Sequence, residues 1–281
     1  MRRMLHHGGS GCKLLVLYAA LACAPAVLAA PSYGDDTPPP EVRAALAQLE
    51  PQRPGVIDMY AVIIAGDGDE DVFRKEAHAV RRVLDDRLGT SGRSLMLINR
   101  RSLPRPEATL KSIGYALQGV AKRMDPAEDI LFVHLTSHGG SNHVLLLRHP
   151  ALELYGLDPK YLRALLDQTN VRHRVVVVSA CYSGGFIAPL ATAETLILTA
   201  ANLGRRSYGC GRDSEITEFS KALYLKALGQ TRSLRTAGSL AIEIVHNDER
   251  AARLEHSYPQ LRSGFAIEDK LRVMERQLAS P

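Results

Sequence analysis

Residues 129–140 have the sequence DILFVHLTSHGG, and residues 171–185 have the sequence VRHRVVVVSACYSGG. Each segment contains a short run of apolar residues, which is typical of a strand that is buried on both faces. Each run ends in a polar turn that contains glycine. Such strands, when amphipathic helices separate them, form a parallel sheet. The two segments therefore predict an α/β fold.

The rest of the chain repeats this alternation of strands and helices. Further strands are expected at 56–66, 94–100 and 194–201, and helices at 41–50, 71–89, 107–124, 159–169, 214–229 and 232–254. Residues 143–149 are a candidate hairpin partner for the strand before them. We therefore expect a mostly parallel central sheet with helices on both faces.

The N-terminus resembles a targeting segment. Arg2, Arg3 and Lys13 precede the apolar run LLVLYAALACAPAVLAA, which ends in small residues. This pattern predicts a secretory signal peptide that is cleaved after residue 29. Two alternatives remain open, a single membrane anchor and a lipoprotein that is lipidated at Cys23. Pro25 interrupts the run, and no other segment is long and apolar enough to be an integral membrane segment.

The composition is that of a folded protein. Of the 281 residues, 46% are hydrophobic and 23% are charged, which excludes a disordered chain. Removing residues 1–29, with three basic residues and no acidic one, leaves 32 basic and 30 acidic residues. This nearly neutral balance argues against a nucleic-acid partner. We expect a signal peptide over 1–29, a Pro-rich linker and short helix over 30–54, and one domain over 55–281.

Two chemically reactive side chains follow the strands predicted within residues 129–140 and 171–185. His138 precedes two glycines after the first strand, and Cys181 follows the second. The carboxyl ends of parallel strands meet at one edge of a sheet, so neighbouring strands would place thiol and imidazole in one cleft. A free cysteine is mostly protonated near neutral pH and needs a base. His138 is the candidate base and later proton donor, and the N–H groups of Gly139 and Cys181 are a candidate oxyanion hole.

Other interpretations of these side chains are weaker. A buried cysteine is often only a small hydrophobe, and a histidine at a strand end is often only hydrogen-bonded. His134, His138 and His143 are candidate zinc ligands by spacing, but the chain has no HExxH motif and no carboxylate in register. Ser183 does not stand in a G-x-S-x-G motif. We therefore expect neither a metal nor a cofactor.

Five stretches, in the same order along the chain, resemble the legumain-type cysteine peptidases, which share the caspase-like fold. They are AVIIAGDGDEDVFRKEAHAV (61–80), LFVHLTSHGG (131–140), VVVVSACYSGGFI (175–187), LILTAANLGRRSYGC (196–210) and SYPQLRSGF (257–265). The last is similar to a closing segment of bacterial members, which are secreted or envelope proteins. The resemblance covers residues 55–270 and implies a bacterial protein of the periplasm, the cell envelope or the extracellular medium.

The resemblance also implies the site residues. Cys181 corresponds to the nucleophile, His138 to the base and acid, and the Gly139 N–H to an oxyanion-hole donor. It further implies a polar pocket that selects asparagine, and sometimes aspartate, before the scissile bond. Arg74 and Ser207 fall on pocket residues of the family.

The chain departs from the family at several positions. Ser179 stands where legumains have a pocket glutamate, and Val72 stands where an asparagine supports the histidine. Glu215 is the candidate for the acidic pocket residue. Asparagine selectivity is therefore expected to change, because a polar group left without its partner costs binding energy. Cys210 is either a core residue or a partner for Cys181 in a disulfide.

These patterns together predict a cysteine endopeptidase that acts on a peptide or protein through an acyl-enzyme on Cys181. A transpeptidase or transamidase would use the same acyl-enzyme with an amine acceptor. A non-catalytic envelope binding protein with the same fold is the alternative outside enzymes. No long prodomain-like segment follows the last family-like stretch, so legumain-style activation is not expected.

Overall fold

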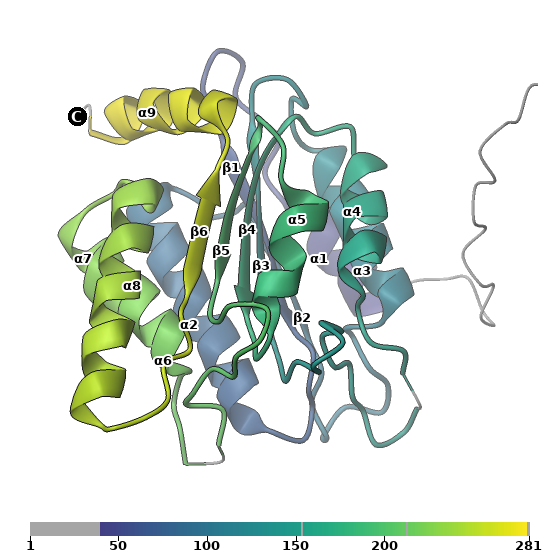
Figure 1. The fold of residues 1–281 in the computed structure, drawn as a ribbon. Helices are drawn as coiled ribbons and strands as arrows, with labels where there is room; N and C mark the ends of the chain where they lie inside the picture. The colour runs from purple at the N-terminus through teal and green to yellow at the C-terminus, as the bar shows by residue number, and fades with distance from the viewer. Residues whose placement is uncertain (1–39, 153, 212, 280–281) are drawn as a thin grey trace, which may run out of the picture. The chain divides into compact units, whose positions relative to one another are not determined.

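Alternating apolar segments form a single six-stranded sheet in the computed structural model, which describes residues 40–152, 154–211 and 213–279. The strand order is β2-β1-β3-β4-β5-β6 (Figure 1). The strands are β1 (Met59–Ala65), β2 (Ser94–Ile98), β3 (Ile130–Thr136), β4 (His173–Ser179), β5 (Thr195–Thr199) and β6 (Gln260–Ser263). Neighbouring strands are parallel, except that β6 runs antiparallel to β5. The predicted mostly parallel sheet is confirmed.

Helices cover both faces of this sheet (Figure 1). The α-helices are α1 (Pro40–Ala47), α2 (Asp71–Leu88), α3 (Leu110–Ala121), α4 (Pro159–Asp167), α5 (Ile187–Leu190), α6 (Glu218–Ser220), α7 (Leu228–Gln230), α8 (Leu234–Ala251) and α9 (Phe265–Ala279). A 3₁₀-helix spans Ser183–Phe186 and a π-helix spans Lys221–Ala227. The arrangement is consistent with a caspase-like sandwich.

Successive residues of each strand supply the two cores. In β1, Ala61 and Ile63 pack with α2, α8 and α9, whereas Tyr60 and Val62 pack with α1, α3 and α4. This follows from strand geometry, since neighbouring side chains point to opposite faces of a sheet. Burial on both faces explains why the strands are continuous apolar runs instead of alternating ones.

Local signals also place the helix ends. Gly89 ends α2 in the left-handed conformation, with φ of 70°, and its N–H donates to the Leu84 carbonyl. Glycine reaches this conformation without the Cβ penalty of other residues. At the start of α4, the Asp158 carboxylate accepts from the Lys160 N–H, and Pro159 occupies the first helical position.

Two sequence predictions differ from the structure, and two elements, β6 and α9, were not predicted. The helix expected over 214–229 is divided into three short elements: α6, the π-helix and α7. Residues 143–149 pair only through isolated bridges, such as Leu145 with Gly139. The strand β6 was not predicted, because its side chains are polar and only half-buried at the sheet edge.

The folded unit begins before the expected domain boundary at residue 55. Val42 and Leu46 of α1 are buried in the core, and Arg123 donates to the carbonyl of Leu46. The unit that contains the sheet therefore includes the short helix that was expected to belong to a linker. The predicted signal peptide and Pro-rich segment lie outside the described residues. None of the described helices has the length and apolar character needed to cross a membrane.

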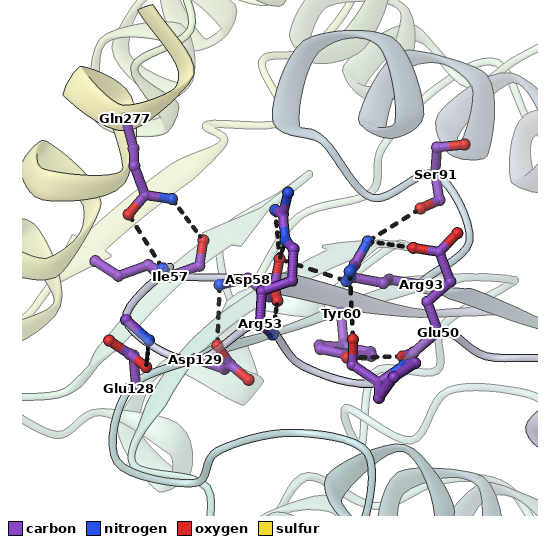
Figure 2. A network of polar contacts seen from close by, with 12 residues as sticks. Glu50, Arg53, Ile57, Asp58, Tyr60, Ser91, Arg93, Glu128, Asp129 and Gln277 are labelled. Carbon is purple, nitrogen blue, oxygen red and sulfur yellow. Dashed lines mark hydrogen bonds and ion pairs between the residues drawn. The ribbon is translucent and has the colours of Figure 1, made fainter. Parts of the chain in front are cut away.

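A buried ionic network lies at the start of β1, at the edge of the sheet opposite the two glycine-containing turns (Figure 2). The Asp58 carboxylate accepts from the backbone N–H, Nε and Nη2 of Arg53 and lies 3.4 Å from the Arg93 Nε. Asp129 accepts from the Asp58 N–H. The nearby Tyr60 has its pKa raised to about 12, chiefly by burial. The network fixes the chain that leads from α1 into the sheet.

His173 makes the stability of the fold depend on pH. Burial, with the charges of Lys270 and Arg172, lowers the His173 pKa from 6.5 to about 4. Between these values the unfolded chain binds a proton that the folded chain excludes, so stability is lost as pH falls from 6.5 toward 4. The expected loss from this residue is at most about 3 kcal/mol.

Urea unfolding at pH 7 and pH 4.5 would measure this contribution. A His173→Leu variant should lose less stability between the two pH values than the wild type does. Equal losses in the two proteins would contradict the assignment.

Candidate active site

The register of β3 and β4 places the two predicted reactive residues side by side. The strands are parallel neighbours, and their last paired residues are Thr136 and Ser179. His138 and Cys181 each follow by two positions, so they leave the sheet at the same level. Neighbouring strands lie about 4.8 Å apart. The condition that the two strands be neighbours, on which the predicted cleft depended, is met.

Cys181 is a partly exposed free thiol at the start of a tight turn. Tyr182, the next residue, is left-handed, with φ of 55°, and its N–H donates to the Arg205 carbonyl. The Ser207 N–H donates to the Cys181 Sγ over 3.4 Å, and the Ser207 hydroxyl lies 3.8 Å from the same sulfur. The thiol in turn lies 3.7 Å from the Ser207 carbonyl oxygen, to which it can donate.

His138 contacts an aromatic ring and lies near a carboxylate. The Phe73 ring meets the imidazole edge-on, with centroids 5.1 Å apart. The His138 Nε2 lies 4.0 Å from the Asp67 Oδ2. Asp67 was not among the predicted site residues. It could have been found by the same rule as His138 and Cys181, because it directly follows a buried strand at the same edge of the sheet.

Gly139 lies directly against the backbone of Cys181. A Cβ built on Gly139 would be 2.1 Å from the Cys181 carbonyl oxygen, so only glycine allows the two turns to approach this closely. Within residues 40–152, 154–211 and 213–279, neither the Gly139 N–H nor the Cys181 N–H donates to a backbone carbonyl. Two unpaired N–H groups on adjacent turns are the arrangement that an oxyanion requires.

Gly139→Ala is expected to lower kcat for peptide hydrolysis by about 100-fold or more, because the new methyl group must displace the Cys181 backbone. Gly229→Ala is the matched control, since a Cβ at Gly229 meets no atom within 4 Å. Steady-state kinetics on both purified variants would check this. Equal activity of the two variants would contradict the role of the close contact.

The predicted pocket residues lie around α2 and the segment that follows β5. Arg74 donates to both carboxylate oxygens of Asp71, over 2.6 and 2.9 Å. Glu215 is exposed and accepts from Lys75 over 2.7 Å. Ser207 borders the thiol directly. The structure therefore brings only Ser207 into contact with Cys181, whereas Arg74 and Glu215 are held by ion pairs on α2.

Ser179 is buried and its hydroxyl is hydrogen-bonded to Thr217 Oγ1 over 2.8 Å. The Thr217 N–H donates in turn to the buried Glu76 carboxylate, which also accepts from the Ser220 hydroxyl. Burial alone would raise the Glu76 pKa, but the hydrogen bond and charge of His134 hold it below its usual value. Any effect of Ser179 on substrate would therefore pass through Thr217.

The three histidines that were considered as zinc ligands have different partners, and those of His138 are given above. His134 contacts Glu76 through Nε2 and Tyr224 through Nδ1, so both ring nitrogens have partners. The His143 Nδ1 lies 3.0 Å from the Tyr182 carbonyl and braces the turn after Cys181. Among the described residues, no group of three or more His, Cys, Asp or Glu side chains could hold a metal ion.

Cys210 is the second free thiol of the described residues. It is half-buried and packs against the core beneath α2 and α8. Burial, and then the charge of Cys181, raise the Cys210 pKa. These contacts favour the core interpretation of Cys210, and the structure shows no disulfide between it and Cys181.

Comparison with known proteins agrees with this geometry. The family model described as the Peptidase C13 family matches residues 116–248, which include His138 and Cys181 but not Arg74. The match covers just under half of the chain and spans both turns of the site. No curated protein matches the chain. The family match, with the sheet order and the paired turns, supports assigning the chain to the peptidase C13 family, the legumain-type cysteine peptidases.

Proposed function

We propose that this cysteine peptidase is an endopeptidase that cleaves peptide bonds through an acyl-enzyme on Cys181. The observation that carries the proposal is the pairing of the two turns. His138 and Cys181 leave adjacent strands at the same level, and Gly139 packs on the Cys181 carbonyl. This arrangement can place a nucleophile, a base and oxyanion donors around one substrate carbonyl.

The proposed reaction has two halves. His138 takes the thiol proton, and the Cys181 sulfur attacks the scissile carbonyl carbon. The N–H groups of Gly139 and Cys181 bind the resulting oxyanion. The C–N bond breaks as His138 protonates the leaving amine, which leaves a thioester. Water, deprotonated by His138, then attacks the thioester and releases the acid with regeneration of the thiol.

Specificity for asparagine or another polar residue before the scissile bond is part of the proposal. Ser207 touches the thiol, and Arg74 and Glu215 lie on the neighbouring helix and loop as candidate substrate-binding groups. Ser179 acts indirectly, through Thr217. With a serine in place of the family's glutamate, the pocket has one carboxylate fewer to accept from a substrate amide, so the preference is expected to be broader than in legumain.

A diverse peptide mixture, incubated with the mature protein and reductant from about pH 4 to 8, tests the proposal. New termini that form with the wild type but not with Cys181→Ala support it, and the residue before each cut reports the pocket. Added amine nucleophiles separate hydrolysis from transamidation. Absence of cleavage, together with a Cys181 that does not react with a thiol probe, would favour the non-catalytic binding protein.

Export is proposed as well. The sequence of residues 1–29 resembles a signal peptide, and a mature enzyme without it would act in the periplasm, in the cell envelope or outside the cell. Mass spectrometry of the protein recovered from an expressing bacterium checks this. A mature N-terminus at residue 30 supports it. A lipidated Cys23 or an intact leader would contradict that cleavage site.

A further inference from the structure

Asp67 is rigidly held at the edge of the active site. It lies two positions past β1 and is buried. Its Oδ1 accepts from the Asp69 N–H over 2.8 Å. The backbone on both sides is paired with Arg148, whose N–H donates to the Gly66 carbonyl and whose carbonyl accepts from the Gly68 N–H. The backbone of this loop is therefore fixed on both sides of Asp67, and one oxygen of its carboxylate is held.

The second carboxylate oxygen of Asp67 is unsatisfied and faces His138. Among the described residues, the Asp67 Oδ2 has no hydrogen-bond partner, although it is buried. It lies 4.0 Å from the His138 Nε2 and 3.6 Å from the Arg148 Nη1. A buried carboxylate oxygen without a hydrogen bond costs free energy. Because this costly carboxylate lies beside the imidazole, we expect it to act on His138.

Within α2, no polar side chain forms a hydrogen bond or ion pair with the His138 imidazole. Val72, where family members have an asparagine for this purpose, is fully buried in the core and carries no polar atom. Phe73 contributes only a ring edge to His138. The carboxylate of Asp67 is therefore the side chain that faces the Nε2 of His138.

In this geometry, the Nε2 of His138 faces the Asp67 carboxylate, and the Nδ1 is left to act as the base. An Nε2–H pointed at a carboxylate leaves Nδ1 unprotonated and able to accept the thiol proton. The same carboxylate stabilises the imidazolium that forms when Nδ1 takes that proton. At 4.0 Å the contact is an ion-pair distance, longer than a hydrogen bond, and contacts of this kind tighten when substrate binds.

We infer that Asp67 is the positioning residue of the catalytic histidine, supplied by the loop after β1 in place of the family's asparagine on α2. The inference rests on the proposed role of His138 as general base. The charged groups that face this pair are Arg148, which opposes Asp67, and Asp69, which lies 3.6 Å from Arg148. Cys181 leaves the neighbouring strand at the same level as His138.

The test uses three single variants of the full mature protein. Asp67→Asn removes the charge but keeps an oxygen for the Asp69 N–H, so the loop should fold. Asp69→Asn is the matched control, since Asp69 shares the Arg148 contact and does not reach His138. Arg148→Gln removes the cation that opposes Asp67, and its side chain is 47% exposed, so the fold should tolerate it.

Asp67→Asn is expected to lower kcat by about 10- to 100-fold, with KM changed by less than about 3-fold. Asp69→Asn should change kcat by less than about 3-fold. The limb of the pH–rate profile that reports His138 should move to lower pH in Asp67→Asn and to higher pH in Arg148→Gln, each by up to about one unit. A purely structural role would lower activity without these opposite movements.

Alkylation of Cys181 by iodoacetamide, followed against pH, provides a readout that needs no substrate. If the wild type cleaves no peptide but Asp67→Asn changes the alkylation profile, the positioning role stands and the endopeptidase proposal fails. If Asp67→Asn has the wild-type kcat and both wild-type profiles, or if Asp69→Asn shows an equal loss, the inference about Asp67 is wrong. If Asp67→Asn does not fold, an Arg148→Gln profile identical to wild type also refutes it.

Discussion

Replacing Cys181 by alanine is expected to lower kcat for peptide hydrolysis by about 10⁴- to 10⁶-fold. Alanine removes the atom that attacks the carbonyl, so no acyl-enzyme can form and only binding and the oxyanion donors remain. Substrate contacts are unchanged, so KM should stay within a few-fold of the wild-type value. Initial rates on a peptide chosen from the cleaved mixture, measured in reductant, would give both constants.

Two further variants make this result specific to the reactive pair. Cys210→Ala removes the second free thiol of the described residues and should keep kcat within about 3-fold of wild type, because that thiol packs in the core. His138→Ala combined with Cys181→Ala should be no worse than Cys181→Ala alone, since residues that act as a unit are not additive. A Cys181→Ala protein that keeps more than about 1% of kcat would refute the acyl-enzyme.

Replacing Asp58 by alanine is expected to destabilise the fold by about 3–5 kcal/mol. The Asp58 carboxylate is fully buried and accepts from Arg53, and Arg93, which is 7% exposed, lies beside it (Figure 2). Removing the anion leaves the buried Arg93 guanidinium with only the exposed Glu50 carboxylate, 2.9 Å from its Nη1, and it frees the chain that leads into β1. The midpoint of urea unfolding, followed by circular dichroism, measures the change.

Asp269→Ala is the control for this experiment. Asp269 forms an ion pair with Arg272 in which both side chains are about two-thirds exposed. Exposed pairs of this kind contribute about 0–1 kcal/mol, so this variant should unfold near the wild-type midpoint. If Asp58→Ala also loses less than about 1 kcal/mol, the network in Figure 2 does not stabilise the fold.

Among the strands, those with the clearest sequence signal are buried on both faces. The strands β1, β3 and β4 are apolar at nearly every position, because helices cover both sides of the sheet. The edge strand β6 has no such pattern, since its side chains are partly in solvent. α9 carries Ile267, Leu271 and Met274 on one buried face, and this spacing would have predicted a helix there.

The candidate site was predictable only in part. His138 and Cys181 follow recognisable strands, so the rule for parallel sheets indicates their shared edge. Asp67 obeys the same rule but lies in the acidic stretch GDGDED, where sequence alone does not distinguish it from Asp69 or Asp71. Only the packing of β1 beside β3 shows which carboxylate faces the imidazole.

Sequence by itself indicated the fold class, the family and the candidate reactive pair, because each depends on local runs of residues and on glycines at strand ends. Tertiary structure decided which side chains share the site. It places Asp67 beside His138, joins the Ser179 hydroxyl to Thr217 by a hydrogen bond, and pairs Arg74 with Asp71. These contacts join residues from different elements, and their distances depend on strand order and register, which no local pattern of residues specifies.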